Sequence, residues 1–542
     1  MPILQAHNLS YQLPAGDTLF HSVSVSMSCN RVGLVGHNGA GKSLLATILT
    51  GERMPAGGSV VCNAETGIFC QQPSHLLKSE ATIAEFLGVA PVLDALARIT
   101  KGECTDYLFE TVGEQWDLPA QLASQLAALG LPDDPQTPCA TLSGGQLAIL
   151  RLWQLFKGQH NLLILDEPSN HLDRRARRWL QAQIQSTAAA VLLISHDREL
   201  LQGMAEIWEL NQTGITVYGG NYAHYAAQKQ LKEQALNRQL ETLHKQQKQV
   251  QQQAQRSLEK AAQRAAQGQK LRGSQAKCLL DKQKDRATAS AASRNKNIES
   301  RQKQLQQRAS QLQSAKCLTQ KQAIHLSTAN AGNKKAITLL NGVLVFGSSQ
   351  PVNLQVGEGD KLHLQGGNGS GKSTLLKTLT GRLPLQAGEL HVNTPLCYLD
   401  QHFSSVLPTL SLLDNLLQQC PALSESDART LLAGIGFRRD SVFNPAETIS
   451  GGEKMKLAML IVSHQPQQPF LLLDEPDNHL DLNAKILLAA ALNRYQGGFI
   501  LISHDTAFAD EAGVKSAYQL TRDESQASFG AGILSDVTVQ GR

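Results

Sequence analysis

The sequence predicts an α/β protein in which two P-loop domains are joined by a long antiparallel α-helical hairpin linker. Three observations support this fold class. A chain of 542 residues exceeds the size at which a single hydrophobic core keeps growing. Four short motifs occur twice, and the segment between the copies is rich in Gln, Lys, Arg and Ala, which favour helices. Apolar runs such as Leu162–Leu165 and Phe470–Leu473 have the length of buried parallel strands.

The repeated motifs indicate a domain duplication. In first and then second copy they are GHNGAGKS at Gly36–Ser43 and GGNGSGKS at Gly366–Ser373, LSGGQ at Leu142–Gln146 and ISGGE at Ile449–Glu453, LILDEPSNHLD at Leu163–Asp173 and LLLDEPDNHLD at Leu471–Asp481, and ISHD at Ile194–Asp197 and Ile502–Asp505. A repeat unit of about 200 residues is a whole domain, not the short unit of a solenoid.

Spacing within the copies locates one difference between them. The interval from the P-loop lysine to a later glutamine is the same in both copies, Lys42 to Gln71 and Lys372 to Gln401. The interval from that glutamine to the serine of the LSGGQ-type motif is longer in the first copy, where it ends at Ser143, than in the second. We therefore expect about 23 extra residues in the first domain, within residues 76–141.

We expect four parts along the chain. They are a first domain at residues 1–221, a basic linker at 222–327, a second domain at 328–521 and a polar tail at 522–542. Within the linker we expect two antiparallel helices, at about 222–267 and 294–325, because glycines and an Ala/Ser/Thr run interrupt the helical composition between them.

The net charge of +4 conceals a strong asymmetry. Residues 226–325 hold 21 Lys and Arg against 6 Asp and Glu, whereas the rest of the chain holds 29 against 40. A projecting basic hairpin can neutralise RNA phosphates, although it could also be a solvated spacer between two domains. The basic residues expected to bind RNA at its tip are Lys270, Arg272, Lys277, Lys282, Lys284 and Arg286.

The remaining composition argues against several protein classes. The nine cysteines include no CxxC pair and no cluster with metal-ligand spacing, so we expect reduced thiols and no metal cluster. No uncharged apolar run reaches 18 residues, and the N-terminus lacks the layout of a secretory signal. We expect a cytoplasmic protein without a membrane span.

Both P-loops indicate binding of a nucleoside triphosphate, because their backbone N–H groups can surround phosphate oxygens at a helix N-terminus. The lysines would reach the β- and γ-phosphates, and Ser43 and Ser373 would be ligands of Mg²⁺. The predicted loop residues are Gly36, His37, Asn38, Gly39, Ala40, Gly41, Lys42 and Ser43, with Gly366, Gly367, Asn368, Gly369, Ser370, Gly371, Lys372 and Ser373.

The carboxylates that follow two apolar strands predict hydrolysis. Asp166 and Asp474 would hold Mg²⁺, and the adjacent Glu167 and Glu475 would polarise the attacking water. A solvated acidic strand end is the simpler interpretation, but it does not explain why both copies continue as Pro-x-Asn-His-Leu-Asp.

Two further residue types recur at fixed distances from these motifs. His196 and His504 follow the aspartates at the same interval in both copies and would contact the γ-phosphate, although a histidine at such a position is often a core residue. Gln71 and Gln401 would contact the metal ion and the phosphates.

Together these residues resemble the ATP-binding cassette superfamily, which implies that the two P-loop domains are ATP-binding cassettes. The resemblance implies hydrolysis of ATP to ADP and phosphate at two head-to-tail sites, within a monomer whose cassettes pair with each other. Each site would be completed by the opposite signature, Ser143, Gly144, Gly145 and Gln146 or Ser450, Gly451, Gly452 and Glu453. Tyr11 and Phe346 lie where the family places an aromatic ring against adenine.

A narrower resemblance is to the ABC-F family, because the chain combines fused cassettes without a membrane span, a basic linker entered by residues 219–225, and the DEPxNHLD motif. The family-specific residues are Asn170, His171 and Asp173, with Asn478, His479 and Asp481. This implies binding to the ribosome at its tRNA exit region, with contacts to rRNA and P-site tRNA. The extra residues of the first domain lie where the family carries an arm, but a simple helical addition fits equally well.

Two alternatives from other classes stay open. The protein could be a DNA-associated or other non-translational tandem-cassette ATPase, which would also use a basic hairpin. It could instead be the ATPase subunit of a transporter, which would not need this linker. The sequence does not distinguish ATP from GTP, nor antibiotic protection from another translational role.

Overall fold

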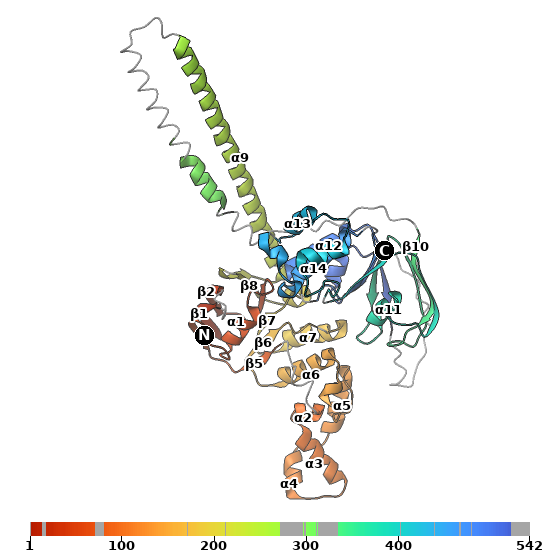
Figure 1. Ribbon diagram of the computed structural model, residues 1–542. Helices are drawn as coiled ribbons and strands as arrows, with labels where there is room; N and C mark the ends of the chain where they lie inside the picture. The colour runs from red at the N-terminus through yellow and green to blue at the C-terminus, as the bar shows by residue number, and fades with distance from the viewer. Residues whose placement is uncertain are drawn as a thin grey trace. The chain divides into compact units, whose positions relative to one another are not determined.

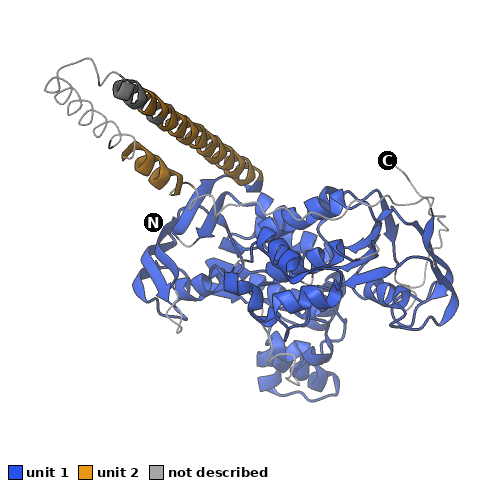
Figure 2. Ribbon diagram, turned by 45° about the horizontal axis from the view of Figure 1, so that its top comes forward, with its two compact units in different colours: residues 1–222, 322–542 blue, residues 223–321 orange. Residues whose placement is uncertain are grey.

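The computed structural model describes residues 2–12, 18–70, 81–170, 172–211, 213–270, 296, 300–310, 312, 334–401, 403–437, 439–465, 468–478 and 480–521. The chain divides into two compact units, one made of Met1–Tyr222 and Gln322–Arg542 and the other of Ala223–Lys321 (Figure 2). The first unit contains both P-loop domains, and the second unit is the segment that separates them along the sequence.

A six-stranded sheet forms the centre of the first domain (Figure 1). Its strands lie in the order β5 (Thr66–Phe69), β6 (Leu162–Asp166), β7 (Ala190–Ile194), β3 (Arg31–Gly36), β8 (Glu206–Asn211) and β9 (Gly214–Gly219). All neighbours are parallel except β8 and β9. Every residue of β6 and β7 is buried, which explains their uninterrupted apolar sequences.

The second domain has a five-stranded sheet that is wholly parallel. Its strands lie in the order β14 (Leu396–Leu399), β15 (Phe470–Asp474), β16 (Phe499–Ile502), β12 (Lys361–Gln365) and β17 (Ser516–Gln519). In each domain the strand before the P-loop neighbours the strand before the histidine, which neighbours the strand that ends in aspartate. Because parallel strands end at one edge, the three motifs meet there.

In each domain a small antiparallel sheet packs against the helix that follows the P-loop. The first of these sheets contains β2 (Thr18–Met27), β1 (Leu4–Gln12) and β4 (Gly57–Cys62), and the second contains β11 (Val352–Gly357), β10 (Lys335–Val343) and β13 (Ala387–Val392). Leu4 and Phe20 of the first small sheet share a buried core with Leu45, which follows the P-loop, and with Trp208 of β8.

The helices that flank the large sheets occupy equivalent positions in the two domains. They are α1 (Lys42–Leu49), α6 (Gly144–Lys157), α7 (Arg174–Ser186) and α8 (Arg198–Gln202) in the first, and α11 (Lys372–Leu379), α14 (Gly451–Ser463), α15 (Leu482–Arg494) and α16 (Thr506–Glu511) in the second. Aspartates cap several of them: Asp173 Oδ1 accepts from Ala176 N at 2.9 Å, and Asp481 Oδ1 accepts from Ala484 N at 2.8 Å.

Each domain also has a helical region before its signature helix. It contains α2 (Ile83–Phe86), α3 (Ala90–Thr100), α4 (Asp106–Val112), α5 (Leu118–Ala128) and a 3₁₀ turn at Cys139–Thr141 in the first domain, and α12 (Leu412–Gln419), α13 (Glu425–Gly434) and 3₁₀ turns at Arg439–Phe443 and Ala446–Thr448 in the second.

Isolated β-bridges relate the two helical regions. Thr82, just before α2, pairs with Pro138, as Ser411, just before α12, pairs with Pro445. Helices α3 and α4 then have no counterpart among the described elements of the second domain, and they pack on each other around Ala95, Leu108 and Val112. We propose that this helix pair carries the extra residues of the first domain.

The second unit contains α9 (Tyr222–Lys270), whose 49 residues correspond to about 70 Å of helix. The helix continues through Gly268 beyond the expected end at residue 267, a position where glycine costs only about 1 kcal/mol. Residues 300–310 are also helical, and residues of α9 and of this segment line one cavity of about 470 Å³, so the two helices lie side by side.

Several predictions about the linker fall outside the described residues. Arg272, Lys277, Lys282, Lys284 and Arg286 lie there, as do the hairpin turn and the tail at residues 522–542. Lys270 is described only as the last residue of α9. In the portions of the chain that the structure covers, no helix has the length and apolar character needed to cross a membrane.

Candidate nucleotide sites

Each P-loop joins a central strand to a helix and holds its lysine over the start of the loop. Lys42 Nζ donates to the carbonyl oxygens of Gly36 at 2.9 Å and His37 at 3.2 Å. Lys372 Nζ donates to Gly366 O at 2.7 Å. Burial lowers the pKa of both lysines, against the opposing effect of nearby carboxylates. Both ammonium groups are therefore fixed at the point where phosphate oxygens would enter the loop.

Glycines are required at particular loop positions by backbone conformation. Gly41 and Gly371, just before the helices, have φ of 91° and 99°, in the left-handed region that side chains disfavour. A Cβ at Gly371 would also lie 2.9 Å from Phe346 O.

Two of the three predicted metal ligands of the second domain, Ser373 and Asp474, are in contact. Asp474 ends β15, and Ser373 Oγ donates to Asp474 Oδ1 at 3.0 Å. In the first domain burial raises the pKa of Asp166, while a hydrogen bond from Ser43 and the charge of Lys42 oppose the shift. A hydroxyl beside a carboxylate supplies the oxygen donors that Mg²⁺ prefers, so these residues fit the ion.

The two predicted general bases share an uncommon backbone conformation. Glu167 and Glu475 have positive φ values of 47° and 50°. Their backbone N–H groups donate across to the neighbouring strand, to Ile194 O at 2.8 Å and Ile502 O at 3.0 Å. A non-glycine residue in this region costs about 1–3 kcal/mol, and such conformations persist where the surrounding structure enforces them.

Each glutamate lies next to the predicted histidine of its own domain. His196 Nε2 is 3.7 Å from Glu167 Oε1, and His504 Nε2 is 3.4 Å from Glu475 Oε1. In both domains the chain between the two residues forms a helix and a strand that return the histidine to the same sheet edge. The geometry thus joins the acid and the histidine that spacing alone predicted.

The two glutamates differ in electrostatics. Burial raises the pKa of Glu167 to about 7. Burial also tends to raise the pKa of Glu475, but the contact with His504 and the charge of Lys372 outweigh it, and that pKa is lowered. In the described part of the chain Glu167 Oε1 has no hydrogen-bond partner, whereas Asn478 Nδ2 donates to Glu475 Oε2.

The cassette motifs reach across from one domain to the other. Asp481 Oδ2 lies 3.2 Å from His37 Nδ1 and accepts from Asn38 N at 3.3 Å, so a second-domain aspartate contacts the first P-loop. Burial alone would raise the pKa of Asp481, but the hydrogen bonds from His37 and Ala484 hold it below its usual range.

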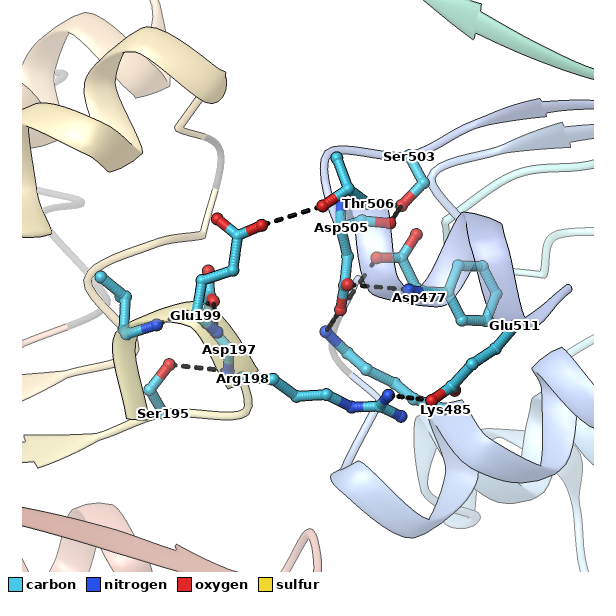
Figure 3. Close-up of polar contacts among 12 residues, drawn as sticks. Ser195, Asp197, Arg198, Glu199, Asp477, Lys485, Ser503, Asp505, Thr506 and Glu511 are labelled. Carbon is cyan, nitrogen blue, oxygen red and sulfur yellow. Dashed lines mark hydrogen bonds and ion pairs between the residues drawn. The ribbon is translucent and has the colours of Figure 1, made fainter. Parts of the chain in front are cut away.

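Residues just after the histidines also join the domains (Figure 3). Arg198 Nη1 lies 2.5 Å from Glu511 Oε1, and Thr506 Oγ1 donates to Glu199 Oε1 at 2.9 Å. Both contacts link α8 to α16. Polar side chains therefore connect the two domains near the carboxyl ends of the strands in their large sheets.

Two cavities lie between the domains at these motifs. One, of about 210 Å³, is lined by Glu167 and His196 of the first domain and by Asn478 and Lys485 of the second. The other, of about 400 Å³, is lined by Lys372 and other residues of the second domain's motifs together with the start of α7 from the first. Each cavity thus combines predicted site residues of one domain with residues in or just after the DEPxNHLD motif of the other.

Comparison with known proteins agrees with this geometry. The family model described as ABC transporter matches residues 20–170 and 349–478. The energy-dependent translational throttle protein EttA of Mycobacterium tuberculosis is 30% identical over 506 residues, covering 89% of this chain and 84% of that protein. The ATP-binding protein Uup of Escherichia coli K12 is 29% identical, covering 89% and 74%.

The chain belongs to the ABC-F family of ATP-binding cassette proteins. It is accordingly an ATPase. A solved complex of the archaeal ribosome recycling factor aABCE1 with the stalk protein aP1 has a similar fold, with 16% identity, a TM-score of 0.55, and coverage of 94% of this chain and 87% of that one.

The signature motifs of this ABC-F chain begin helices α6 and α14. Ser143 Oγ accepts from Gln146 N at 3.3 Å, and Ser450 Oγ accepts from Glu453 N at 3.4 Å, with the Gln146 and Glu453 side chains accepting in return. Neither motif lines the two cavities between the cassettes. Their pairing with the opposite nucleotide therefore stays a prediction.

The predicted adenine contacts are unequal. Phe346 is 65% exposed, and its carbonyl oxygen adjoins the P-loop glycine Gly371. Tyr11 lies on β1 with its ring 6.5 Å from that of Phe20 and beneath the guanidinium of Arg53. Contact of either ring with adenine stays a prediction.

Three predicted motif residues have little or no structural description. Gln71, His171 and His479 lie outside the described residues. Gln401 is described and follows β14 by two residues, at the same sheet edge as Asp474.

Sequence reasoning missed two features of these sites. Tyr398 donates its hydroxyl to Asp474 Oδ2 at 2.8 Å, although no repeated motif marked it. Arg177 pairs with Asp197 at 3.3 Å, and Lys485 pairs with Asp505 at 3.4 Å. These two ion pairs lie at equivalent positions of the repeat, so a residue-by-residue comparison of the copies could have found them.

Proposed function

We propose that this ABC-F protein hydrolyses ATP at two composite sites and uses the cycle to act on the ribosome from the cytoplasm. In this proposal it binds near the tRNA exit region, contacts rRNA and P-site tRNA, and modulates translation through its basic linker. The glutamate–histidine contact at the same sheet edge of both cassettes is the observation that carries the hydrolytic part.

The ribosomal part rests on charge and on relatives. The linker segment holds 21 basic against 6 acidic residues, and α9 gives it a long helical surface. RNA helices are recognised mainly through shape and backbone phosphates, which suits such a surface without stacking aromatic residues. The similarity to a protein named as a translational throttle favours the ribosome over DNA.

Within each site the residues have distinct tasks. The P-loop amides and Lys42 or Lys372 bind the phosphates, and the serine–aspartate pair holds Mg²⁺, which would neutralise charge on the phosphate oxygens. Glu167 and Glu475 orient the attacking water and accept its proton. The neighbouring histidine fixes the carboxylate and would face the terminal phosphate.

Because the motifs of one cassette reach the P-loop of the other, nucleotide binding is coupled to cassette closure. Asp481 already contacts the first P-loop at His37 and Asn38. In the proposal the signature serines Ser143 and Ser450 complete the sites when ATP is bound, and hydrolysis releases the pair. Closure and release would move the linker relative to bound RNA.

The test is sucrose-gradient sedimentation of the Glu167→Gln/Glu475→Gln variant with ribosomes and ATP. We expect turnover to fall about 100-fold or more, since general-base catalysis contributes that much. We expect the closed variant to migrate with ribosomes only when ATP is present, while the wild-type protein dissociates as it hydrolyses ATP. Migration at the top of the gradient with ATP would contradict the ribosomal proposal.

A second arm separates ribosome binding from general polyanion binding. Replacing Lys277, Lys282, Lys284 and Arg286 with Gln should weaken ribosome binding and reduce its salt dependence. Retention on DNA that equals retention on ribosomes would favour a DNA-associated ATPase instead. Partition into membranes only with a membrane subunit would favour the transporter alternative.

A further inference from the structure

The cavity at the second P-loop receives an unusual set of side chains from the first cassette. Arg174, Arg175 and Arg178, in the first turns of α7, line it opposite Lys372 and His504. The cavity has a volume of about 400 Å³, which is ample for a phosphate group and its contacts.

The charge of this lining is strongly positive. Arg174, Arg175, Arg178 and Lys372 are opposed by Asp173, which is the single carboxylate among the described residues that line the cavity. Such a lining attracts an anion, and the nearest anion in the cycle is the triphosphate held by the second P-loop.

One of the three arginines already has a structural task. Arg175 Nη2 donates to Ala128 O at 3.1 Å and so ties α7 to the end of α5. Arg174 and Arg178, by contrast, are exposed and form no hydrogen bond or ion pair within the described residues. They are four residues apart on one helix and therefore lie on one face, one turn apart.

The duplicated cassette supplies an internal comparison. After the DEPxNHLD motif, equivalent residues of the two copies are 308 positions apart in the sequence, so Arg174 corresponds to Leu482 and Arg178 to Ile486. Arg177 and its counterpart Lys485 are both basic, and both form an ion pair with an aspartate of their own cassette. The cavity at the first P-loop is lined by Lys485 but by neither Leu482 nor Ile486. The unpaired basic residues are thus specific to the second site.

The position of these arginines favours the terminal phosphate as their ligand. The cavity is lined by Gly367 at the start of the P-loop and by His504, the residue expected beside the γ-phosphate. A guanidinium binds phosphate through two parallel N–H groups and keeps its charge at any physiological pH. An ammonium at the same position would keep the charge but lose that geometry.

We propose that Arg174 and Arg178 of the first cassette bind the terminal phosphate of the ATP held by the second P-loop. The second site then distinguishes ATP from ADP more strongly than the first site, whose corresponding positions are apolar. This inference rests on the proposed function, because it requires that the second P-loop bind ATP across the cassette interface.

The test measures nucleotide affinity at one site at a time. In a Lys42→Ala background, which disables the first P-loop, we compare the parent with the Arg174→Leu/Arg178→Ile variant, which carries the second cassette's own residues. Titration with mant-ATP and Mg²⁺ should show affinity reduced about tenfold or more, since two charge-assisted contacts are lost. Affinity for mant-ADP should change less than about twofold, because the missing contacts are to the γ-phosphate.

Two matched controls protect the interpretation. In a Lys372→Ala background the same arginine substitutions should leave mant-ATP affinity at the first site unchanged. The Arg174→Lys/Arg178→Lys variant retains charge and helix propensity and should recover part of the ATP affinity, which a folding defect would not allow.

Other results would overturn the inference. Equal losses for ATP and ADP would mean a general field effect, and no loss for either would mean that the arginines do not contact nucleotide. Normal ATP affinity with lost ribosome binding would assign them to RNA. If the Lys42→Ala parent binds no nucleotide, both proposals are overturned. If the Arg174→Leu/Arg178→Ile variant loses its preference for ATP over ADP but the protein does not bind ribosomes, only the ribosomal part of the proposed function is contradicted.

Discussion

The two nucleotide sites have the same motifs but different environments. Glu167 is partly buried beside a histidine at 3.7 Å, and its pKa is raised to about 7. Glu475 is nearer its histidine, at 3.4 Å, and its pKa is lowered. Identical residue types therefore do not imply identical protonation, because burial and the exact separation of two side chains decide it.

The largest expected consequence of this difference concerns stability. A Glu167 pKa of about 7 in the folded state, against the usual 4.5, means that the folded state binds the proton more tightly. The resulting stabilisation is complete below pH 4.5 and disappears as the pH rises through 7, a change of about 3 kcal/mol. Glu167→Gln should therefore raise the free energy of unfolding at pH 8 and give no gain at pH 4.

Glu475 gives the opposite sign. Because its pKa is lowered in the folded state, Glu475 stabilises the protein at pH values above its pKa in the unfolded chain, and this stabilisation is lost as the pH falls. Glu475→Gln should thus be destabilising at pH 8. Urea unfolding of both variants at pH 4 and pH 8 checks the pair, and a gain for both or a loss for both at pH 8 would refute the comparison.

The second expected consequence is a change of about tenfold in the rate of ATP turnover. At pH 6 a carboxyl group with a pKa of about 7 is only about one-tenth ionised, so hydrolysis at that pH should come mainly from the second site. Glu475→Gln should lose about tenfold in ATP turnover at pH 6 and about twofold at pH 8. Glu167→Gln should lose almost nothing at pH 6. Equal losses for the two variants at pH 6 would show that the bases titrate together.

The smallest expected effect concerns the contacts between cassettes. Asp481 contacts the first P-loop at His37, whereas Asp173 within the described residues accepts from Ala176 in its own helix. Asp481→Asn should preserve the helix cap but lose charge at the loop, costing about 1 kcal/mol, less in 1 M salt. Asp173→Asn should cost less. Thermal melts at low and high salt measure both, and a larger loss for Asp173→Asn would reverse the assignment.

Much of the fold and the core of each site could be predicted from the sequence. The P-loops, Asp166 and Asp474, and the two histidines are marked by local sequence and by equal spacing in two copies. Strand order then brings them to one sheet edge, as a parallel α/β arrangement requires.

Other features could not be predicted because they depend on packing. The different pKa values of Glu167 and Glu475 come from burial and from distances that repeat-level spacing does not encode. The contact of Asp481 with His37 joins residues 444 positions apart in different cassettes. Tyr398 beside Asp474 has an apolar residue, Ile68, at the equivalent position of the first copy, so the repeat gave no signal for it.

The left-handed backbone at Glu167 and Glu475 has a consequence for how this chain can change over generations. Glycine adopts that conformation without strain, so a Glu-to-Gly substitution relieves about 1 kcal/mol or more of backbone strain at each position. At Glu167 it also removes a carboxyl group whose ionised form destabilises the fold, whereas at Glu475 it removes a stabilising carboxylate. A lineage released from selection for hydrolysis would therefore gain stability by Glu167→Gly, the same mutation that ends catalysis at the first site. Loss of hydrolysis at the first site is thus favoured thermodynamically, and only continued use of the ATPase cycle opposes it.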